Sequence, residues 1–309
     1  MTQPPKKDHK NLFIYGLFIL LLFSLWIPLM PLITFWFLPL PFLLFAANFR
    51  SSGLLPLFIL ICAGISYLFG GPILAAMIIF AAITGITMGW MYQRKDTSGL
   101  EVFMSGLFSG AASLLILTII ANQWYGLLDL FQEMLEEQWA ATEQLLESYG
   151  MEDEQLLGAP LPIGVFLPSM IAYLSLITSL INLWIGRRIL IRWKFPGKYL
   201  PPFRDWRLPR AFFFFYFIVI LISFFTEADQ SYWAAILSLQ LLLWQLFLIQ
   251  GFSFISFFLH TAGKGRIWLL LTILISLLLP PFALFVHFLG ILDTGTQIRK
   301  LIQKRRKKD

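Results

Sequence analysis

Residues 72–91 read PILAAMIIFAAITGITMGWM and carry no charged side chain. At a rise of about 1.5 Å per residue, a helix of this length spans the roughly 30 Å hydrocarbon core of a bilayer. Similar runs fill the chain, which is 58% hydrophobic and only 13% charged, whereas soluble domains are about 25% charged. A water-soluble fold could not bury this much apolar surface. The sequence therefore predicts an all-α, polytopic transmembrane helical bundle.

Nine apolar segments are candidates for spanning helices. They cover residues 12–30, 32–48, 54–69, 72–91, 100–120, 163–185, 211–225, 232–259 and 267–292. The first eight predict eight spans. The ninth carries Pro280 and Pro281 at its middle, where proline removes helix hydrogen bonds. This Pro-broken segment either returns to the side it came from or makes a ninth crossing, so the sequence predicts eight or nine crossings.

The distribution of lysine and arginine predicts the orientation, because cytoplasmic loops are enriched in both. With the N-terminus inside, the basic positions all fall on the cytoplasmic side, at Arg50, 94–95, 186–210 and 260–266. The outer connections contain neither residue, at 28–31, 70–72, 121–162 and 226–231. A ninth crossing would break this rule, because it would export the basic residues of 299–308.

Spans and loops divide the chain into six predicted regions. These are a front membrane bundle at 1–120, an acidic extracytoplasmic segment at 121–162, a sixth span at 163–185, a basic cytoplasmic loop at 186–210 (the basic loop below), a rear membrane bundle at 211–292 and a polybasic tail at 293–309. The acidic segment has nine acids and no base, with apolar residues at helical spacing, which predicts an amphipathic helix.

The basic loop contains eight lysines and arginines, interleaved with aromatic residues such as Trp193 and Tyr199. Such a composition favours contact with the anionic lipids of the inner leaflet. We expect the same contact from 299–308. The net charge of +6 would suggest nucleic acid in a soluble protein, but here the topology accounts for it. The lipid bilayer is therefore the predicted partner, and no nucleic acid is expected.

Three stretches carry a family resemblance. They are LPLPFLLFAANFRSSG at 38–53, YLFGGPILAAMIIFAAITGITMGWMYQRK at 67–95 and GILDTGTQIRK at 290–300. Together they resemble the YybS-type family of uncharacterised bacterial membrane proteins over most of the chain. The resemblance implies a bacterial cytoplasmic membrane location and no established activity.

The first six spans are also distantly similar to the substrate-capturing subunits of energy-coupling-factor transporters. Those subunits carry spaced small residues along their first helix, whereas residues 11–26 offer only Gly16.

No catalytic, metal or nucleotide motif is visible, so the sequence predicts no enzyme and no cofactor. His9, His260 and His287 have no partner at helical spacing for a metal. His287 lies within an apolar segment and is either a functional ionisable group or a neutral, hydrogen-bonded one. The near absence of charge inside the spans argues against an ion-coupled pump.

Small and polar residues within the spans predict helix packing. Glycines at 85, 89, 106 and 110 follow small-xxx-small patterns that allow close approach of helices. Asn182, Ser238, Gln240, Gln245 and Gln250 are polar positions within spans. Hydrogen bonds between helices are the expected role of these polar side chains, with pore lining as the alternative.

A candidate solute site falls near the outer ends of the front spans, at Trp36, Tyr67, Asn122 and Trp124. Aromatic faces could hold a flat ring, and Asn122 offers a donor and an acceptor. The alternative is that the aromatic residues anchor the helices at the interface. Two functions follow: a component that binds or transports a small-molecule solute, or a non-catalytic scaffold that recruits partners through its basic loop and tail.

Overall fold

The computed structural model describes residues 7–25, 27, 29–48, 54–148, 162–226, 232–296 and 298–306. Every regular element in these ranges is a helix, so the predicted all-α class is confirmed. Four helices are long and apolar enough to cross a membrane: Gly70–Gln93, Gly99–Tyr125, Ile163–Arg192 and Trp233–Thr261. Shorter apolar helices accompany them, and the count of eight or nine crossings stays a prediction.

Several residues that carried sequence predictions lie outside the described ranges. They are Arg50, residues 149–161 of the acidic segment and 307–309 of the tail. The chain divides into two compact units. Unit 1 comprises residues 1–130 and 170–200, and unit 2 comprises residues 131–169 and 201–309.

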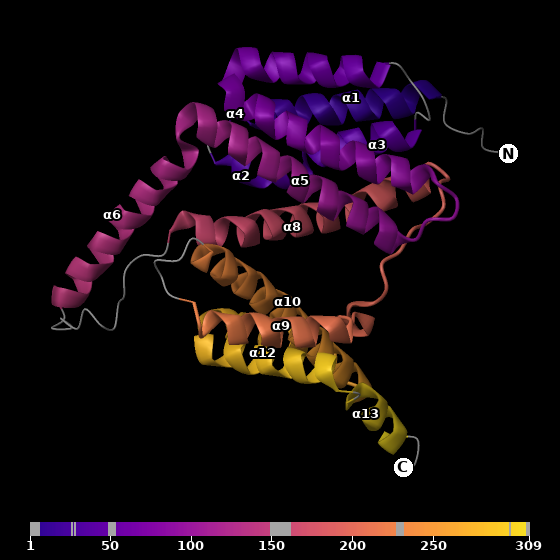
Figure 1. Cartoon of the computed structure of the whole chain (residues 1–309). Coiled ribbons are helices and arrows are strands. Elements are labelled where there is room, and N and C mark those ends of the chain that lie inside the picture. The colour runs from indigo at the N-terminus through magenta and orange to yellow at the C-terminus, as the bar shows by residue number, and fades with distance from the viewer. Residues whose placement is uncertain are drawn as a thin grey trace. The chain divides into compact units, whose positions relative to one another are not determined.

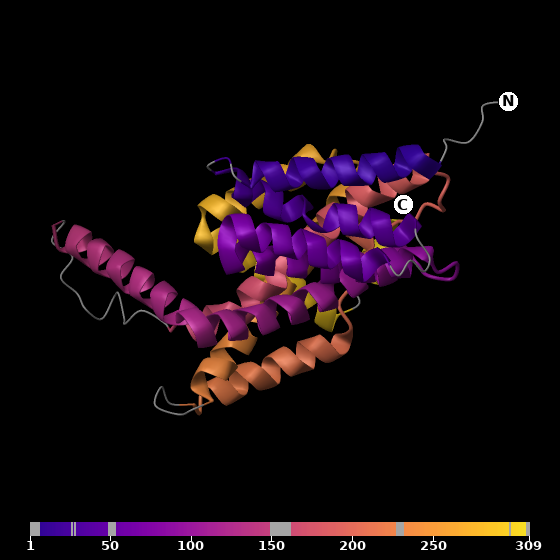
Figure 2. The same cartoon turned by 90° about the horizontal axis from the view of Figure 1, so that it is seen from above.

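Unit 1 is built around a short central helix. Its elements are α1 (Lys7–Ser24), α2 (Met30–Thr34), the 3-10 turn η1 (Phe35–Phe37), α3 (Pro39–Asn48), α4 (Leu54–Gln93), α5 (Gly99–Tyr125), the start of α6 (Leu127–Ser148) and most of α8 (Ile163–Arg192). Every residue of α3 from Pro39 to Ala47 is buried. Figures 1 and 2 show α1 side by side with α3, and the two helices are in contact.

The predicted span 32–48 is present as an apolar helical segment, Leu32–Asn48, in which the 3-10 turn η1 lies between α2 and α3. Pro39 and Pro41 occupy the first turn of α3, where a missing N–H costs nothing. Helix α4 contains the two predicted spans 54–69 and 72–91. Gly71 separates them with φ of 70° and ψ of −168°, a conformation that glycine adopts far more readily than other residues.

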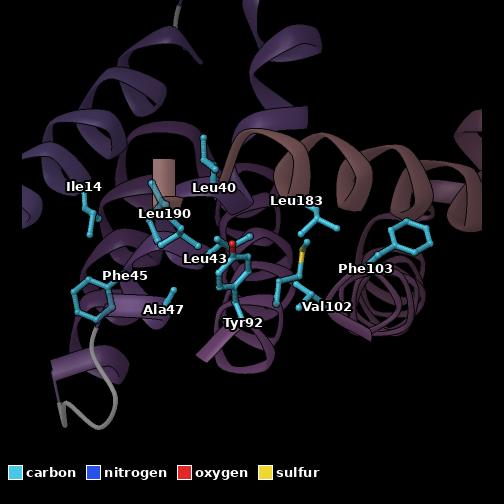
Figure 3. Close-up of a cluster of buried hydrophobic side chains, with 12 residues drawn as sticks. Ile14, Leu40, Leu43, Phe45, Ala47, Tyr92, Val102, Phe103, Leu183 and Leu190 are labelled. Carbon is cyan, nitrogen blue, oxygen red and sulfur yellow. The ribbon is translucent and has the colours of Figure 1, made fainter. Parts of the chain in front are cut away.

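The predicted glycine contacts hold within unit 1. A Cβ atom at Gly85 would lie 2.7 Å from Cβ of Phe42 and 2.9 Å from the amide nitrogen of Leu43, so α4 touches the backbone of α3. The core beside this contact contains Leu43, Leu190 and Tyr92. Figure 3 shows Tyr92 near the middle of these side chains, with its hydroxyl oxygen inside the cluster.

Unit 2 holds the end of the acidic helix α6, the first residues of α8 and the C-terminal helices. These are η2 (Phe203–Asp205), α9 (Arg210–Ser223), α10 (Trp233–Thr261), α11 (Ile267–Leu278), α12 (Pro280–Gly295) and α13 (Ile298–Arg306). The predicted break in the last apolar segment is confirmed at Leu279, directly before Pro280 and Pro281 in the first turn of α12. The predicted acidic helix is also present as α6.

Helices α10 and α12 run in the same direction, as their contacts show. Trp244 contacts His287, Phe247 contacts Gly290 and Gln250 contacts Asp293. In these three contacts the residue number rises along both helices together, which indicates that α10 and α12 are parallel. Figure 1 shows α12 beside α9 and α10. The C-terminal end of α12 therefore lies at the same end of unit 2 as that of α10.

Candidate functional site

Asp293 and Arg299 form an ion pair that is buried in unit 2. Nε of Arg299 donates to the two carboxylate oxygens at 2.8 and 3.0 Å, and Nη2 donates to Oδ2 at 2.5 Å. The side chains are only 1% and 2% exposed. Burying charge costs several kcal/mol per ion, on the order of the attraction gained, so such a pair needs good geometry and further hydrogen bonds.

The further hydrogen bonds of Arg299 reach the basic loop. Nη1 donates to the carbonyl oxygen of Arg204 at 2.5 Å, and Nη2 donates to the hydroxyl of Ser253 at 3.2 Å. The Ser253 hydroxyl in turn lies 2.8 Å from the carbonyl oxygens of both Phe203 and Trp206. One guanidinium thus connects α12, α10 and the backbone of the loop.

Gln250 completes the connection from α10. Its Nε2 donates to Oδ2 of Asp293 at 2.5 Å, and its Oε1 accepts from the amide of Leu208 at 3.0 Å. Hydrogen bonding between helices, as predicted for Gln250, is confirmed. We call Asp293, Arg299, Gln250 and Ser253 the loop lock. The second half of the basic loop is held against unit 2 by these four side chains.

Only part of the loop lock was visible in the sequence. The run 290–300 carries the family resemblance and Gln250 is a polar position within a predicted span, but the sequence did not predict the buried charge of Asp293, which lies one residue past the predicted segment 267–292. Asp293 and Arg299 are six residues apart and would point in different directions on one continuous helix. The helix ends at Gly295 and Thr296 is extended, so the chain turns and brings Arg299 back to Asp293.

His287 is hydrogen-bonded on both ring nitrogens. Nδ1 lies 3.1 Å from the carbonyl oxygen of Trp244, which can only accept, so Nδ1 carries the proton. Nε2 lies 3.2 Å from the hydroxyl of Tyr216 and accepts from it when the ring is neutral. The predicted hydrogen bonding of His287 is therefore confirmed, and its neutral state stays a prediction. No group of three or more metal-ligating side chains occurs in the part of the chain that the structure describes.

The first half of the basic loop is held against unit 1 by a separate set of contacts. The hydroxyl of Tyr92 donates to the carbonyl oxygen of Pro196 at 2.8 Å. Lys198 donates to the carbonyl oxygen of Arg94 at 2.5 Å and to the hydroxyl of Thr97. Burial lowers the pKa of Lys198, and the nearby charges of Glu101 and Asp96 oppose this shift. Both halves of the loop are therefore fixed, each to its own unit.

The four predicted solute-site residues have separate surroundings. Asn122 accepts from the amide of Leu128 at 2.9 Å and so joins α5 to α6. Tyr67 and Trp124 are 59% and 75% exposed, and Trp36 accepts from Asn182 through its backbone oxygen. No hydrogen bond or ring contact joins any two of these four described residues. Solute binding by this set stays a prediction.

A buried polar stripe was not predicted as a site. Ser175, Thr178, Ser179 and Asn182 share one face of α8 and are completely buried, opposite Thr84 of α4. The four hydroxyls and Oδ1 of Asn182 have no hydrogen-bond partner within the described protein. A Cβ atom at Gly106 of α5 would lie 2.8 Å from the Ser179 hydroxyl. Helix α5 therefore packs directly against this stripe at Gly106.

Two cavities lie beside the basic loop in unit 2. The larger, of about 320 Å³, is lined among others by Arg207, Arg210 and Lys300. The smaller, of about 90 Å³, is lined among others by Arg204, Lys264 and Arg266. Five of these basic side chains are exposed: Arg207, Arg210, Lys264, Arg266 and Lys300. We call these five the basic face.

Four helices that are long and apolar enough to cross a membrane, together with many exposed apolar side chains, are the features of a helical membrane protein. Residues 17–294 match the family described as "Predicted membrane protein (DUF2232)". The chain belongs to this family, and the resemblance found in the sequence is confirmed.

One relative is "Uncharacterized protein YybS" of Bacillus subtilis (strain 168). It is 25% identical over 301 residues, which cover 92% of this chain and 94% of the relative. The chain is thus homologous to a bacterial membrane protein over nearly its full length. No solved structure gives a significant match.

Proposed function

We propose that this protein is a non-catalytic scaffold or regulator of the bacterial cytoplasmic membrane, which recruits acidic cytoplasmic partners to its basic face. The loop lock is the observation that carries the proposal. A buried ionisable group at the membrane is costly and commonly marks a functional region. Here the buried ion pair fixes the position of the basic loop and of the start of the tail. It does not line a path through the helices.

The lock gives the basic face a defined shape. Arg207 lies within the locked backbone of residues 203–208, Arg210 follows it, and Lys300 is adjacent to Arg299. A flexible loop would lose conformational entropy when it binds a partner, whereas a preorganised one avoids much of that cost. A fixed set of exposed cations is therefore suited to recognising an acidic protein surface.

The same contacts support a cytoplasmic tail. The C-terminal end of α12 lies beside the basic loop, so the tail begins on the side where the loop is. Helices α11 and α12, at 12 and 16 residues, extend about 18 and 24 Å, short of a core of about 30 Å. We therefore propose that the last apolar segment turns back at Pro280 and Pro281 and that loop and tail both face the cytoplasm.

Proximity labelling in cells tests the recruitment. A biotin ligase fused after Asp309 should label a reproducible set of cytoplasmic proteins, beyond those labelled by the same ligase on an unrelated polytopic protein. The double variant Lys264→Gln/Arg266→Gln should no longer label this set of proteins, although the variant itself is present at the same abundance as the wild type. Lys95→Gln/Arg192→Gln removes the same charge from unit 1 and should keep it. Identical labelling by the wild type and the unrelated protein would rule the scaffold out.

The buried stripe of α8 favours a second candidate, a transport-class protein. Neutral oxygens such as those of Thr84, Ser175 and Asn182 suit water or a monovalent cation. On this alternative, Na⁺ or K⁺ should raise the unfolding temperature of the purified protein over N-methylglucamine, and Asn182→Leu should abolish the rise. Asn122→Ala is the matched control, because the Asn122 side chain accepts a hydrogen bond from the amide of Leu128 and lies outside the stripe. No effect of either cation would remove this candidate.

A further inference from the structure

The larger of the two cavities beside the basic loop in unit 2 has the composition of an anion site. Its volume is about 320 Å³, and Arg207 and Arg210 enter it from the loop while Thr294, Thr296 and Lys300 enter it from the C-terminal segment. Cations of the basic loop and of the C-terminal segment thus line the same cavity. The loop lock fixes both segments, so these cations are held close together without a partner.

The cavity has a net positive charge. Asp293 also lines it, but Arg299 already engages both oxygens of that carboxylate. Among the described residues, no acidic side chain lies within ion-pair distance of Arg207, Arg210 or Lys300. These three cations therefore have no anionic partner within the described protein.

The start of α9 adds to the positive potential. Arg210 is the first residue of this 14-residue helix, and the preceding Pro209 provides no side-chain cap. Helix N-termini carry partial positive charge and free amide groups, which suit a phosphate. The hydroxyls of Thr294 and Thr296 at the same cavity donate to the carbonyl oxygens of Gly290 and Leu292, so the cations and the helix N-terminus supply the donors for a phosphate.

The surface next to the cavity is suited to lipid. From the same helix, Phe214, Phe217, Ile218 and Leu221 present one apolar face at the spacing i, i+3, i+4 and i+7. These side chains are 62%, 63%, 51% and 50% exposed. A phosphate at the start of α9 can thus continue into acyl chains along this face, which a free phosphate ion would leave uncovered.

We propose that this cavity binds the phosphate of an anionic glycerophospholipid, with Arg207, Arg210 and Lys300 as its ligands and the apolar face of α9 against the acyl chains. The site takes three cations of the basic face, Arg207, Arg210 and Lys300, whereas the recruitment proposed above is tested on the other two, Lys264 and Arg266. A bound lipid would neutralise one side of the basic face and leave the other side free for a partner.

Native mass spectrometry of the detergent-solubilised full chain tests the site. Equal amounts of phosphatidylglycerol and phosphatidylcholine are offered, and the protein should retain one phosphatidylglycerol in preference. Arg207→Gln/Arg210→Gln/Lys300→Gln should reduce that preference by roughly tenfold or more, given the gain that each basic residue provides at an anionic surface. The single variant Lys300→Gln removes one exposed charge, should fold normally and should give an intermediate loss.

The control is Lys95→Gln/Arg192→Gln/Lys194→Gln, which removes three exposed or half-exposed charges elsewhere and should keep the full preference. Equal retention of the two lipids by the wild type, or equal loss in the control and the cavity variant, would overturn the site. Displacement of phosphatidylglycerol by millimolar inorganic phosphate would overturn the lipid as its occupant. Persistence of the lipid in excess phosphate supports it.

Discussion

At the scale of residues, the buried ion pair is better explained by positioning than by stability. Replacing a buried ion pair with apolar residues of similar volume is often neutral or stabilising, whereas removing one partner is costly. Arg299 makes one contact that an apolar side chain could not make, the 2.5 Å hydrogen bond to the carbonyl oxygen of Arg204. The pair with Asp293 therefore specifies where the basic loop lies.

This account predicts different effects for two variants. Arg299→Gln leaves Asp293 buried without its partner and should lower the free energy of unfolding by about 3 kcal/mol or more. Asp293→Leu/Arg299→Met should recover much of this loss but leave the loop undocked. Thermal unfolding in detergent measures the first effect, and hydrogen exchange of the amides of 203–208 measures the second.

The exposed Arg192 provides the control, since Arg192→Gln should change the free energy of unfolding by less than about 0.5 kcal/mol. If the amides of 203–208 remain protected in Arg299→Gln, the lock does not hold the loop.

At the scale of elements, the contact between α10 and α12 depends on glycine. Gly290 faces the carbonyl oxygen of Phe247, and Gly251 faces that of Val286. A Cβ atom at either glycine would overlap the opposite backbone. Such close packing of small residues is a principal source of helix association in membranes. It also sets the register at which Gln250 meets Asp293.

Gly290→Ala should therefore separate α10 from α12 and lower the free energy of unfolding by about 1–3 kcal/mol. Gly16→Ala is the matched control, because no side chain or backbone lies within 4 Å of the added Cβ. Because alanine has a higher helix propensity than glycine, Gly16→Ala should leave the free energy of unfolding unchanged or raise it by up to about 1 kcal/mol. Chemical unfolding of both variants measures the difference, and equal effects would show that the contact is not tight.

The sequence predicted those elements that depend on local composition. Hydropathy located the apolar helices, Gly71 marked the turn within α4, and Pro280 marked the break before α12. Hydropathy did not show that α8 continues to Arg192, seven residues past the expected boundary at 185. There the guanidiniums of Arg187 and Arg188 lie 4.3 and 3.8 Å from the ring centroids of Tyr199 and Trp184, which accommodates charge on the helix.

The candidate sites were harder to predict than the helices. The loop lock joins residues that are 40 or more positions apart, such as Gln250 and Asp293, and a single sequence does not report which polar side chains meet. The four predicted solute-site residues share only their residue type and their expected depth in the membrane. Asn122 shows the weakness of that criterion, because its carbonyl oxygen is already used by the amide of Leu128.

At the scale of the whole molecule, the account rests on one relation, that the basic loop and the start of the tail lie on the same side of the membrane. The lock joins them directly through Arg299 and Arg204. The positive-inside rule independently favours the cytoplasm for both, since otherwise the basic residues of 299–308 would be exported. If both lie in the cytoplasm, the chain between the basic loop and the tail crosses the membrane an even number of times.

Labelling of single cysteines in intact cells measures this relation most directly. In a Cys62→Ala background, Asp205→Cys reports on the loop and Leu301→Cys on the tail, because both native side chains are exposed. An impermeant thiol reagent should modify neither site in intact cells and should modify both after the membrane is permeabilised. Labelling of the 301 site in intact cells, while the 205 site remains protected, would place loop and tail on opposite sides and contradict the account.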